Sequence, residues 1–329
     1  MQSPKKIHVV TKAYLANWAV DGLVRPVSVR YGRQKLRTPS GLAWQSEWWG
    51  ANDPGLNKAC EESCGKLETL LPDALASVEA EWPPDAATRA VLAQFMALHV
   101  VRTPAFVDRF QPLRDTSIAE YRNKFPSPEA YETWRRAMQS DRERANKLLS
   151  LINKLSTIIV SMHWTLLRFD EPLLITGDQP ICPVPLLTPG IGKPIAAIPR
   201  DGWLDTCEIR CAFTPRHALL ATWYTGPPTD PVSGTWSQAV NLNASVAAQT
   251  VEQRFQTPDR EPAMPAAILR VPQTVLSPIS IEVLSDYSLD AAMRSRLRHR
   301  TAEELQRLIE RRDHKTITVV RTSPATRTA

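Results

Sequence analysis

The chain has 329 residues, of which 43% are hydrophobic and 22% are charged, and its formal net charge is +6. This is ordinary globular composition, and the length suits one large domain or two of average size. No run of about 18 apolar residues occurs, so the sequence predicts no membrane span. The five cysteines are spread along the chain, which favours a reducing compartment. We therefore expect a soluble cytoplasmic protein.

Residues 1–55 begin with a short apolar segment around His8, and the alternating residues 23–30 predict a pair of strands. In residues 56–162 apolar side chains recur at helical spacing, which predicts a helical part. The expected helices lie around 59–71, 90–101, 128–139 and 141–162.

Two local signals define the second of these helices. Asp85 follows two prolines, a pattern typical of a helix start, because Asp can accept hydrogen bonds from the free N–H groups there. The helix should end before Pro104, since the residue before a proline avoids the helical region. Residues 90–101 are apolar nearly all round, so we expect this helix to be buried.

Residues 163–285 have the character of strands. We expect a strand pair at 164–169 and 173–176, further strands at 207–213 and 218–223, one helix over 236–255, and a last strand pair near 268 and 275–283. A basic helix should follow at 291–312.

Helices that come first and strands that come later indicate an α+β fold. We expect an N-terminal, mainly helical half packed against a strand-rich half with mixed or antiparallel pairing and a C-terminal helix. Residues 1–320 should form one large domain, made of parts 1–55, 56–162, 163–285 and 286–320, with 321–329 as a tail.

Basic residues are concentrated near the C-terminus, at Arg294, Arg296, Arg298, Arg300, Arg307, Arg311, Arg312 and Lys315. This excess permits an anionic partner, either nucleic acid or another anionic ligand. Arg298 and Arg307 are our candidate binding residues for such a partner. The alternative is a solvated helix face, which is the commoner use of a charge run.

Familiar catalytic motifs are absent from the sequence. It contains no Gly-x-Ser-x-Gly elbow, no Walker loop, no Gly-x-Gly-x-x-Gly turn and no His-Glu-x-x-His. Cys60 and Cys64 have the same spacing as Cys207 and Cys211, but neither pair lies in a Gly-containing knuckle, so we predict no metal site. The cofactor is left open.

Three polar residues remain as candidate catalytic groups. His8 lies in the first apolar segment, Arg102 ends the most apolar helix, and Asp178 follows a short apolar run in a Gly-Asp-Gln-Pro turn. Together they would supply an acid or base, an anion clamp, and a base or metal ligand. The alternative is structural: Arg102 pairs with Asp178 or with a helix carboxylate, and His8 bonds to a backbone carbonyl. His99, on an apolar helix face, is expected to be a core histidine.

Several short motifs occur in the order seen in a mostly bacterial family, the domain of unknown function 4238, which the chain resembles over most of residues 7–256. The motifs are Ile7–Trp18, Phe95–Pro104, Leu174–Ile181, Phe213–Leu220 and Asn241–Phe255. Family members typically carry a His-Tyr-x-Pro-like start, an Arg-Thr-Pro helix end and a Thr-Ser-Asp-x-Pro turn.

This chain departs from the family pattern in two places. Thr11 or a neighbour replaces the early proline, and Gly177 stands where serine is usual. The resemblance implies an α+β fold and points to His8, Arg102 and Asp178, but it implies no activity. Gln179 in the turn and Asn241 at the start of the last motif are further candidate binding residues.

Three functions are compatible with these residues. The first is an enzyme acting on a phosphate-bearing substrate, such as nucleic acid, with His8, Arg102 and Asp178 in its site. The second is a non-catalytic module that binds nucleic acid or protein, in which Arg102 and Asp178 are structural. The third is a scaffold in which an Arg102–Asp178 pair only joins two halves of the molecule.

Overall fold

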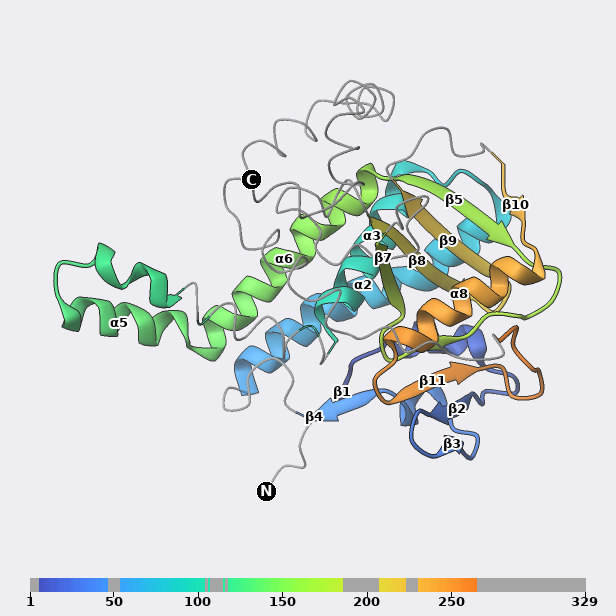
Figure 1. Ribbon diagram of the computed structural model, residues 1–329, viewed down its shortest axis with the longest axis horizontal. Coiled ribbons are helices and arrows are strands. Elements are labelled where there is room, and N and C mark those ends of the chain that lie inside the picture. Colours follow the sequence, from blue (N-terminus) through green and yellow to red (C-terminus); the bar gives the residue numbers. More distant parts are fainter. Residues whose placement is uncertain are drawn as a thin grey trace, which may run out of the picture.

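The structure is a computed structural model that describes residues 6–46, 54–103, 106, 115, 118–185, 207–222 and 230–264 (Figure 1). It confirms the α+β class: a group of helices packs with three sheets, one of which joins strands from both ends of the described chain. The strands predicted near 268 and 275–283 and the helix predicted at 291–312, with Arg298 and Arg307, lie outside the described residues. None of the described helices is long and apolar enough to cross a membrane.

The predicted helical part is confirmed. The α-helices are α1 (Lys12–Leu15), α2 (Pro54–Ala80), α3 (Ala86–Val101), α5 (Pro128–Met138), α6 (Asp141–Ser161) and α8 (Trp236–Gln249). Short 3-10 helices are η1 (Ala16–Trp18), η2 (Pro39–Gly41) and η3 (Tyr121–Lys124). Asp85 caps α3 as expected, since its carboxylate accepts the N–H of Thr88 at 2.7 Å. Arg102 is the residue at which α3 ends.

Three sheets contain the described strands. A two-stranded sheet joins β1 (Lys6–His8) and β4 (Trp44–Ser46). A five-stranded sheet has the order β10 (Val232–Ser233), β5 (His163–Arg168), β9 (His217–Thr222), β8 (Cys207–Thr214) and β7 (Ile181–Pro185). A four-stranded sheet has the order β3 (Gly32–Arg33), β2 (Arg25–Ser28), β11 (Gln253–Gln256) and β6 (Thr176–Gly177). The strand pair predicted within 23–30 is found only in part: β2 lies in that stretch, but its antiparallel partner β3 follows it.

Helices cover both faces of the five-stranded sheet (Figure 1). On one face Arg210 of β8 donates to the Ser245 hydroxyl of α8 at 2.8 Å. Helices α2 and α3 lie behind the other face (Figure 1). The Tyr14 hydroxyl of α1 donates to the Ala212 carbonyl of β8 at 2.5 Å. Helix α3 is the central helix of the core, and His99 within it is fully buried, as predicted.

The predicted strand pair 164–169 and 173–176 is wrong, although both segments are buried. β5 pairs with β9 and β10, whereas β6 begins only at Thr176 and pairs with β11 in another sheet. Side chains satisfy the backbone of the intervening residues in place of a ladder: Trp18 donates to the Leu174 carbonyl at 3.2 Å, and Asn243 accepts the Ile175 N–H at 3.0 Å. The apolar run correctly predicted that these residues are buried, but it could not predict which groups their backbone bonds to.

The single helix predicted over 236–255 is also wrong, because the chain turns after α8 and returns as β11. The turn begins at Thr250, whose backbone is extended. The next three N–H groups bond to the Asp178 carboxylate and not to helix carbonyls. A partner distant in sequence therefore ends the helix.

Candidate functional site

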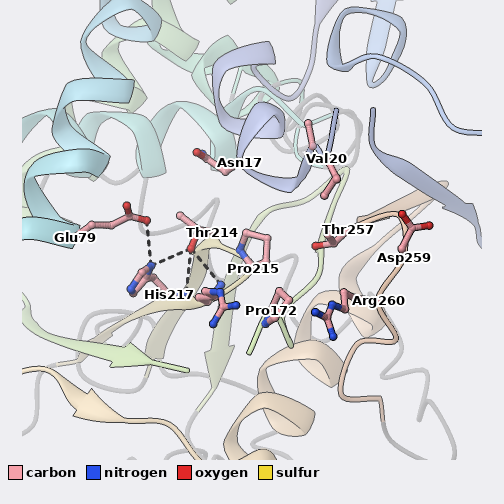
Figure 2. Close-up of a pocket in the computed structure, with 12 residues that line it drawn as sticks. Asn17, Val20, Glu79, Pro172, Thr214, Pro215, His217, Thr257, Asp259 and Arg260 are labelled. Carbon is pink, nitrogen blue, oxygen red and sulfur yellow. Dashed lines mark hydrogen bonds and ion pairs between the residues drawn. The ribbon is translucent and has the colours of Figure 1, made fainter. Parts of the chain in front are cut away.

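The described residues form a cleft of about 510 Å³, which we name the Arg216–Arg260 cleft (Figure 2). Its volume lies within the roughly 300–1,000 Å³ common for small-molecule sites. Five separate segments line it, with residues Asn17, Ala19, Val20, Glu79, Pro172, Thr214, Pro215, Arg216, His217, Thr257, Asp259 and Arg260. Figure 2 shows Glu79 and His217 at one end of the cleft and Asp259 and Arg260 at the other.

The turn between β8 and β9 positions His217. The Thr214 hydroxyl accepts the backbone N–H groups of Arg216 at 3.2 Å and His217 at 3.1 Å, which holds the turn closed. The same hydroxyl lies 3.0 Å from His217 Nδ1. Glu79, near the end of α2, places its Oε1 3.2 Å from that ring nitrogen. The imidazole is therefore held on one side by two oxygens from distant parts of the chain.

Burial lowers the pKa of His217 below its ordinary value, the Glu79 carboxylate opposes this shift, and the charge of Arg168 adds to it. The imidazole is therefore neutral at pH 7. Because Nδ1 faces a carboxylate, Nδ1 carries the single proton and Nε2 keeps the lone pair. This tautomer can accept a proton at Nε2, which is the chemistry of a general base.

Cationic groups and a hydroxyl without a partner complete the cleft. Arg216 and Arg260 are exposed, and within the described residues neither guanidinium has an ion-pair partner. The hydroxyl oxygen of Thr257 is buried and makes no hydrogen bond within the described part of the chain. Asp259 is the remaining exposed carboxylate of the lining. The cleft thus offers hydrogen-bond donors in excess.

The predicted site residues His8 and Arg102 lie elsewhere, close to one another. His8 Nε2 is 3.2 Å from the Ser40 carbonyl oxygen, and its pKa is lowered by burial, with the charge of Arg102 adding to that shift. The Arg102 side chain is 1% exposed and donates to Glu61 Oε1 at 2.9 Å and to Glu68 Oε1 at 2.8 Å. These contacts match the structural alternative, a pair with helix carboxylates.

Asp178 bonds to neither of these two residues. Its carboxylate accepts the N–H groups of Val251 at 3.0 Å, Glu252 at 2.5 Å and Gln253 at 2.9 Å. Burial raises the pKa of Asp178, and the three N–H groups oppose that shift. The Arg102–Asp178 pair offered by the structural alternative is thus not formed, because each side chain has other partners.

Gln179 and Asn241, the other described candidates, also lie apart from the cleft. Gln179 and Asp178 line a separate cavity of about 70 Å³, a volume that suits water but not a ligand. Within the described residues the buried Gln179 Nε2 has no hydrogen-bond partner. Asn241 is exposed on α8, and its carbonyl accepts the Ser245 hydroxyl at 3.0 Å. No cluster of His, Cys, Asp and Glu in the described part of the chain is suited to a metal ion.

The model of one protein family, "Protein of unknown function (DUF4238)", matches residues 6–253. The chain belongs to the DUF4238 family. This confirms the resemblance found in the sequence. No curated protein and no solved structure matches the chain.

In this DUF4238 member the family match includes Glu79 and the β8–β9 turn, whereas Thr257 and Arg260 lie beyond it. Sequence reasoning missed the cleft, although Thr214-Pro-Arg-His217 was one of the segments that carried the resemblance. An Arg-His pair in a Pro-containing turn between two strands was the available signal. Its partner Glu79 is 138 positions away, and no sequence pattern joins the two.

Proposed function

We propose that this DUF4238 protein binds a small phosphate-bearing ligand in the Arg216–Arg260 cleft. The observation that carries the proposal is the Thr257 hydroxyl, buried without a partner in a cleft that also presents two guanidinium groups without ion pairs among the described residues. Buried polar groups normally have partners, and an acceptor bound in the cleft would give the Thr257 hydroxyl one.

The donors of the cleft suit phosphate. Arg presents several N–H groups in a planar fork, which matches two oxygens of a phosphate or carboxylate. Phosphate carries more acceptor oxygens and more charge than a carboxylate, so it satisfies two Arg side chains and a hydroxyl together. The +6 net charge of the chain favours the approach of such an anion.

Isothermal titration calorimetry of the full chain with inorganic phosphate, pyrophosphate, adenosine monophosphate and succinate tests this proposal. We expect the phosphates to bind and succinate to bind more weakly. Arg216→Gln and Arg260→Gln should each weaken binding about tenfold, the fold-change that corresponds to about 1.4 kcal/mol for a charge-assisted hydrogen bond. Thr257→Val, which keeps the side-chain shape, should weaken binding about fivefold or more.

Arg142→Gln is the matched control, because Arg142 is an exposed arginine on α6 that does not line the cleft. It should bind the phosphates like the unmodified chain. The proposal fails if the unmodified chain binds none of the phosphates, or if all three Arg variants weaken binding equally. Tighter binding of succinate than of phosphate would reassign the site to carboxylates.

A second candidate function is an enzyme that acts on this bound ligand, and the Glu79–His217 pair favours it. A carboxylate at Nδ1 fixes the tautomer of a general-base histidine, and the lowered pKa keeps the base neutral at pH 7. Release of inorganic phosphate from p-nitrophenyl phosphate measures this activity. His217→Gln should abolish release while pyrophosphate still binds. No release by the unmodified chain would leave binding as the function.

The catalytic role predicted for His8, Arg102 and Asp178 stays a prediction. Their contacts favour the alternative in which Arg102 and Asp178 are structural, since each has strong partners within the fold. The predicted cytoplasmic location stays a proposal as well. The free, buried thiols of Cys60, Cys64, Cys182 and Cys211 support it.

A further inference from the structure

A second basic surface lies outside the cleft. The segment from Gly22 to Ser46 contains Arg25, Arg30, Arg33, Lys35 and Arg37 and no Asp or Glu. Residues 25–37, which we name the basic hairpin, include β2 and β3, and β3 is the outer strand of the four-stranded sheet. In Figure 1 this hairpin lies at the edge of the molecule, remote from α5 and α6.

The tip of the basic hairpin is fixed and presents an aromatic ring. The Ser28 hydroxyl accepts the N–H groups of both Arg30 and Tyr31 at 3.2 Å, and Gly32 has a positive φ of 72° that closes the turn. The Tyr31 residue is 72% exposed, and the Arg30 guanidinium lies 5.2 Å from the centroid of its ring. An exposed ring on a closed turn costs little conformational entropy when a partner stacks on it.

The cations of the hairpin form a row on its exposed side. Along residues 33–37 Arg33, Lys35 and Arg37 are exposed and the two residues between them are not. In extended backbone, side chains two residues apart point the same way, roughly 6–7 Å from one another. In the same sheet, Val27 of β2 is the register partner of Arg33 on one side and of Arg254 of β11 on the other, so the three residues form one row across the strands.

Most of this positive charge has no counter-ion in the described part of the chain. Arg33 pairs with Glu261, but Arg30, Lys35, Arg37 and Arg254 have no ion-pair partner there. Burial of part of its side chain lowers the pKa of Arg254, which nevertheless stays charged at pH 7. A row of uncompensated cations suits a linear polyanion better than a single anion.

We infer that the basic hairpin binds single-stranded nucleic acid, with its Arg and Lys side chains on the phosphates and a base stacked on Tyr31. Aromatic side chains beside a cationic track are the common means of binding unpaired bases, whose ring faces are free. A bilayer surface fits less well, because membrane-binding surfaces need a larger apolar face and only Val29 is exposed beside Tyr31 on this turn. This inference goes beyond the proposed cleft ligand and does not depend on it.

Fluorescence anisotropy of the full chain with a labelled twelve-nucleotide oligothymidylate at several salt concentrations tests the inference. The triple variant Arg30→Gln, Lys35→Gln and Arg37→Gln should bind at least tenfold more weakly. It should also flatten the slope of log K against log salt by about 2, since each phosphate contact on a single strand contributes about 0.7. Tyr31→Ala should weaken binding by about fivefold or more without changing that slope, because stacking is not ionic.

The control is a triple variant with the same change in charge on the helices, Arg122→Gln, Arg136→Gln and Arg142→Gln, all exposed positions. Circular dichroism should show that both triple variants are folded. The inference is overturned if the unmodified chain does not bind the oligonucleotide, if both triple variants weaken binding equally, or if anionic phosphatidylserine vesicles compete fully at low concentration. The hairpin triple variant should still bind pyrophosphate, so failure here and failure of the cleft proposal are separate results.

Discussion

The Asp178 carboxylate accepts the backbone N–H of Glu252 at 2.5 Å and thereby joins two turns that are 74 residues apart. The N–H groups on either side of Glu252 bond to the same carboxylate. One side chain therefore ends α8 and sets the start of β11. In the sequence, the position of Asp178 after an apolar segment suggested a catalytic role. In the structure, that position lets its carboxylate hold the turn between α8 and β11.

Replacing Asp178 should destabilise the fold without affecting the cleft. Asp178→Ala leaves three N–H groups without their acceptor, and we expect the free energy of unfolding to fall by about 2–3 kcal/mol. Asp178→Asn keeps one acceptor oxygen and should cost less. Urea denaturation measures both, with Asp170→Asn as a control at an exposed aspartate. An Asp178→Ala variant of unchanged stability that had lost phosphate binding would restore the catalytic prediction.

Gly177, where serine is usual in the family, lacks room for a side chain. A Cβ atom there would lie 2.5 Å from Thr250 Oγ1 and 3.4 Å from Val246 Cγ1. Gly177→Ser should therefore cost about 1–3 kcal/mol by overpacking. Adding Thr250→Ala removes the clashing oxygen, and the double variant should be more stable than Gly177→Ser alone.

Gly65 provides the matched control for that substitution, since nothing lies within 4 Å of its Cβ position. Gly65→Ser should leave stability unchanged or slightly raised, because serine is the better helix former. Thermal denaturation of the four variants checks the set. Additive effects of Gly177→Ser and Thr250→Ala would show that the two side chains do not compete for space.

Arg102 should be needed for stability through Glu61 and Glu68. Arg102→Met removes the cation between two carboxylates, and we expect a loss of about 3 kcal/mol. The same change made together with Glu61→Gln and Glu68→Gln should cost at least about 1 kcal/mol less, because no uncompensated charge remains. Equal losses in the two backgrounds, measured in urea, would contradict this account.

His99 should make the protein less stable in acid. Burial lowers its pKa to about 3, and the neutral ring accepts the Thr11 N–H at 3.2 Å while its Nδ1 donates to the Phe95 carbonyl at 2.9 Å. An unfolded histidine has a pKa of about 6.5 and takes up a proton first, so this stability is complete above pH 6.5 and is lost as the pH falls towards 3.

Between pH 7.5 and pH 5 the loss attributable to His99 should be about 2 kcal/mol. His99→Gln should abolish this component of the pH dependence, even if the variant is less stable at every pH. His163→Gln, on β5, should leave it in place. A His99→Gln variant with the unmodified slope of stability against pH would refute the assignment.

Local signals were readable from the sequence and distant partners were not. Asp85 bonds to Thr88 three residues away, so the start of α3 followed directly from the order of residues. The end of α8 depends on Asp178, and the irregular path of Leu174 and Ile175 depends on Trp18 and Asn243. Each of these partners is more than sixty residues distant, and an apolar run or a helical period says nothing about them.

The candidate site follows the same division. Polar residues beside apolar elements led to His8, Arg102 and Asp178, which proved to have partners inside the fold. The cleft forms because the end of α2 lies beside the β8–β9 turn. No local sequence pattern predicts that contact between distant segments.

The Asn243 side chain connects helix α8 to segments that border the cleft. Its amide donates to the carbonyls of Leu173 at 2.7 Å and Ala263 at 2.6 Å, and its oxygen accepts the Ile175 N–H. Leu173 directly follows Pro172, and Ala263 lies three residues after Arg260, so both anchored residues are close in sequence to walls of the cleft. Asn243 thus ties the chain beside two walls of the cleft to α8.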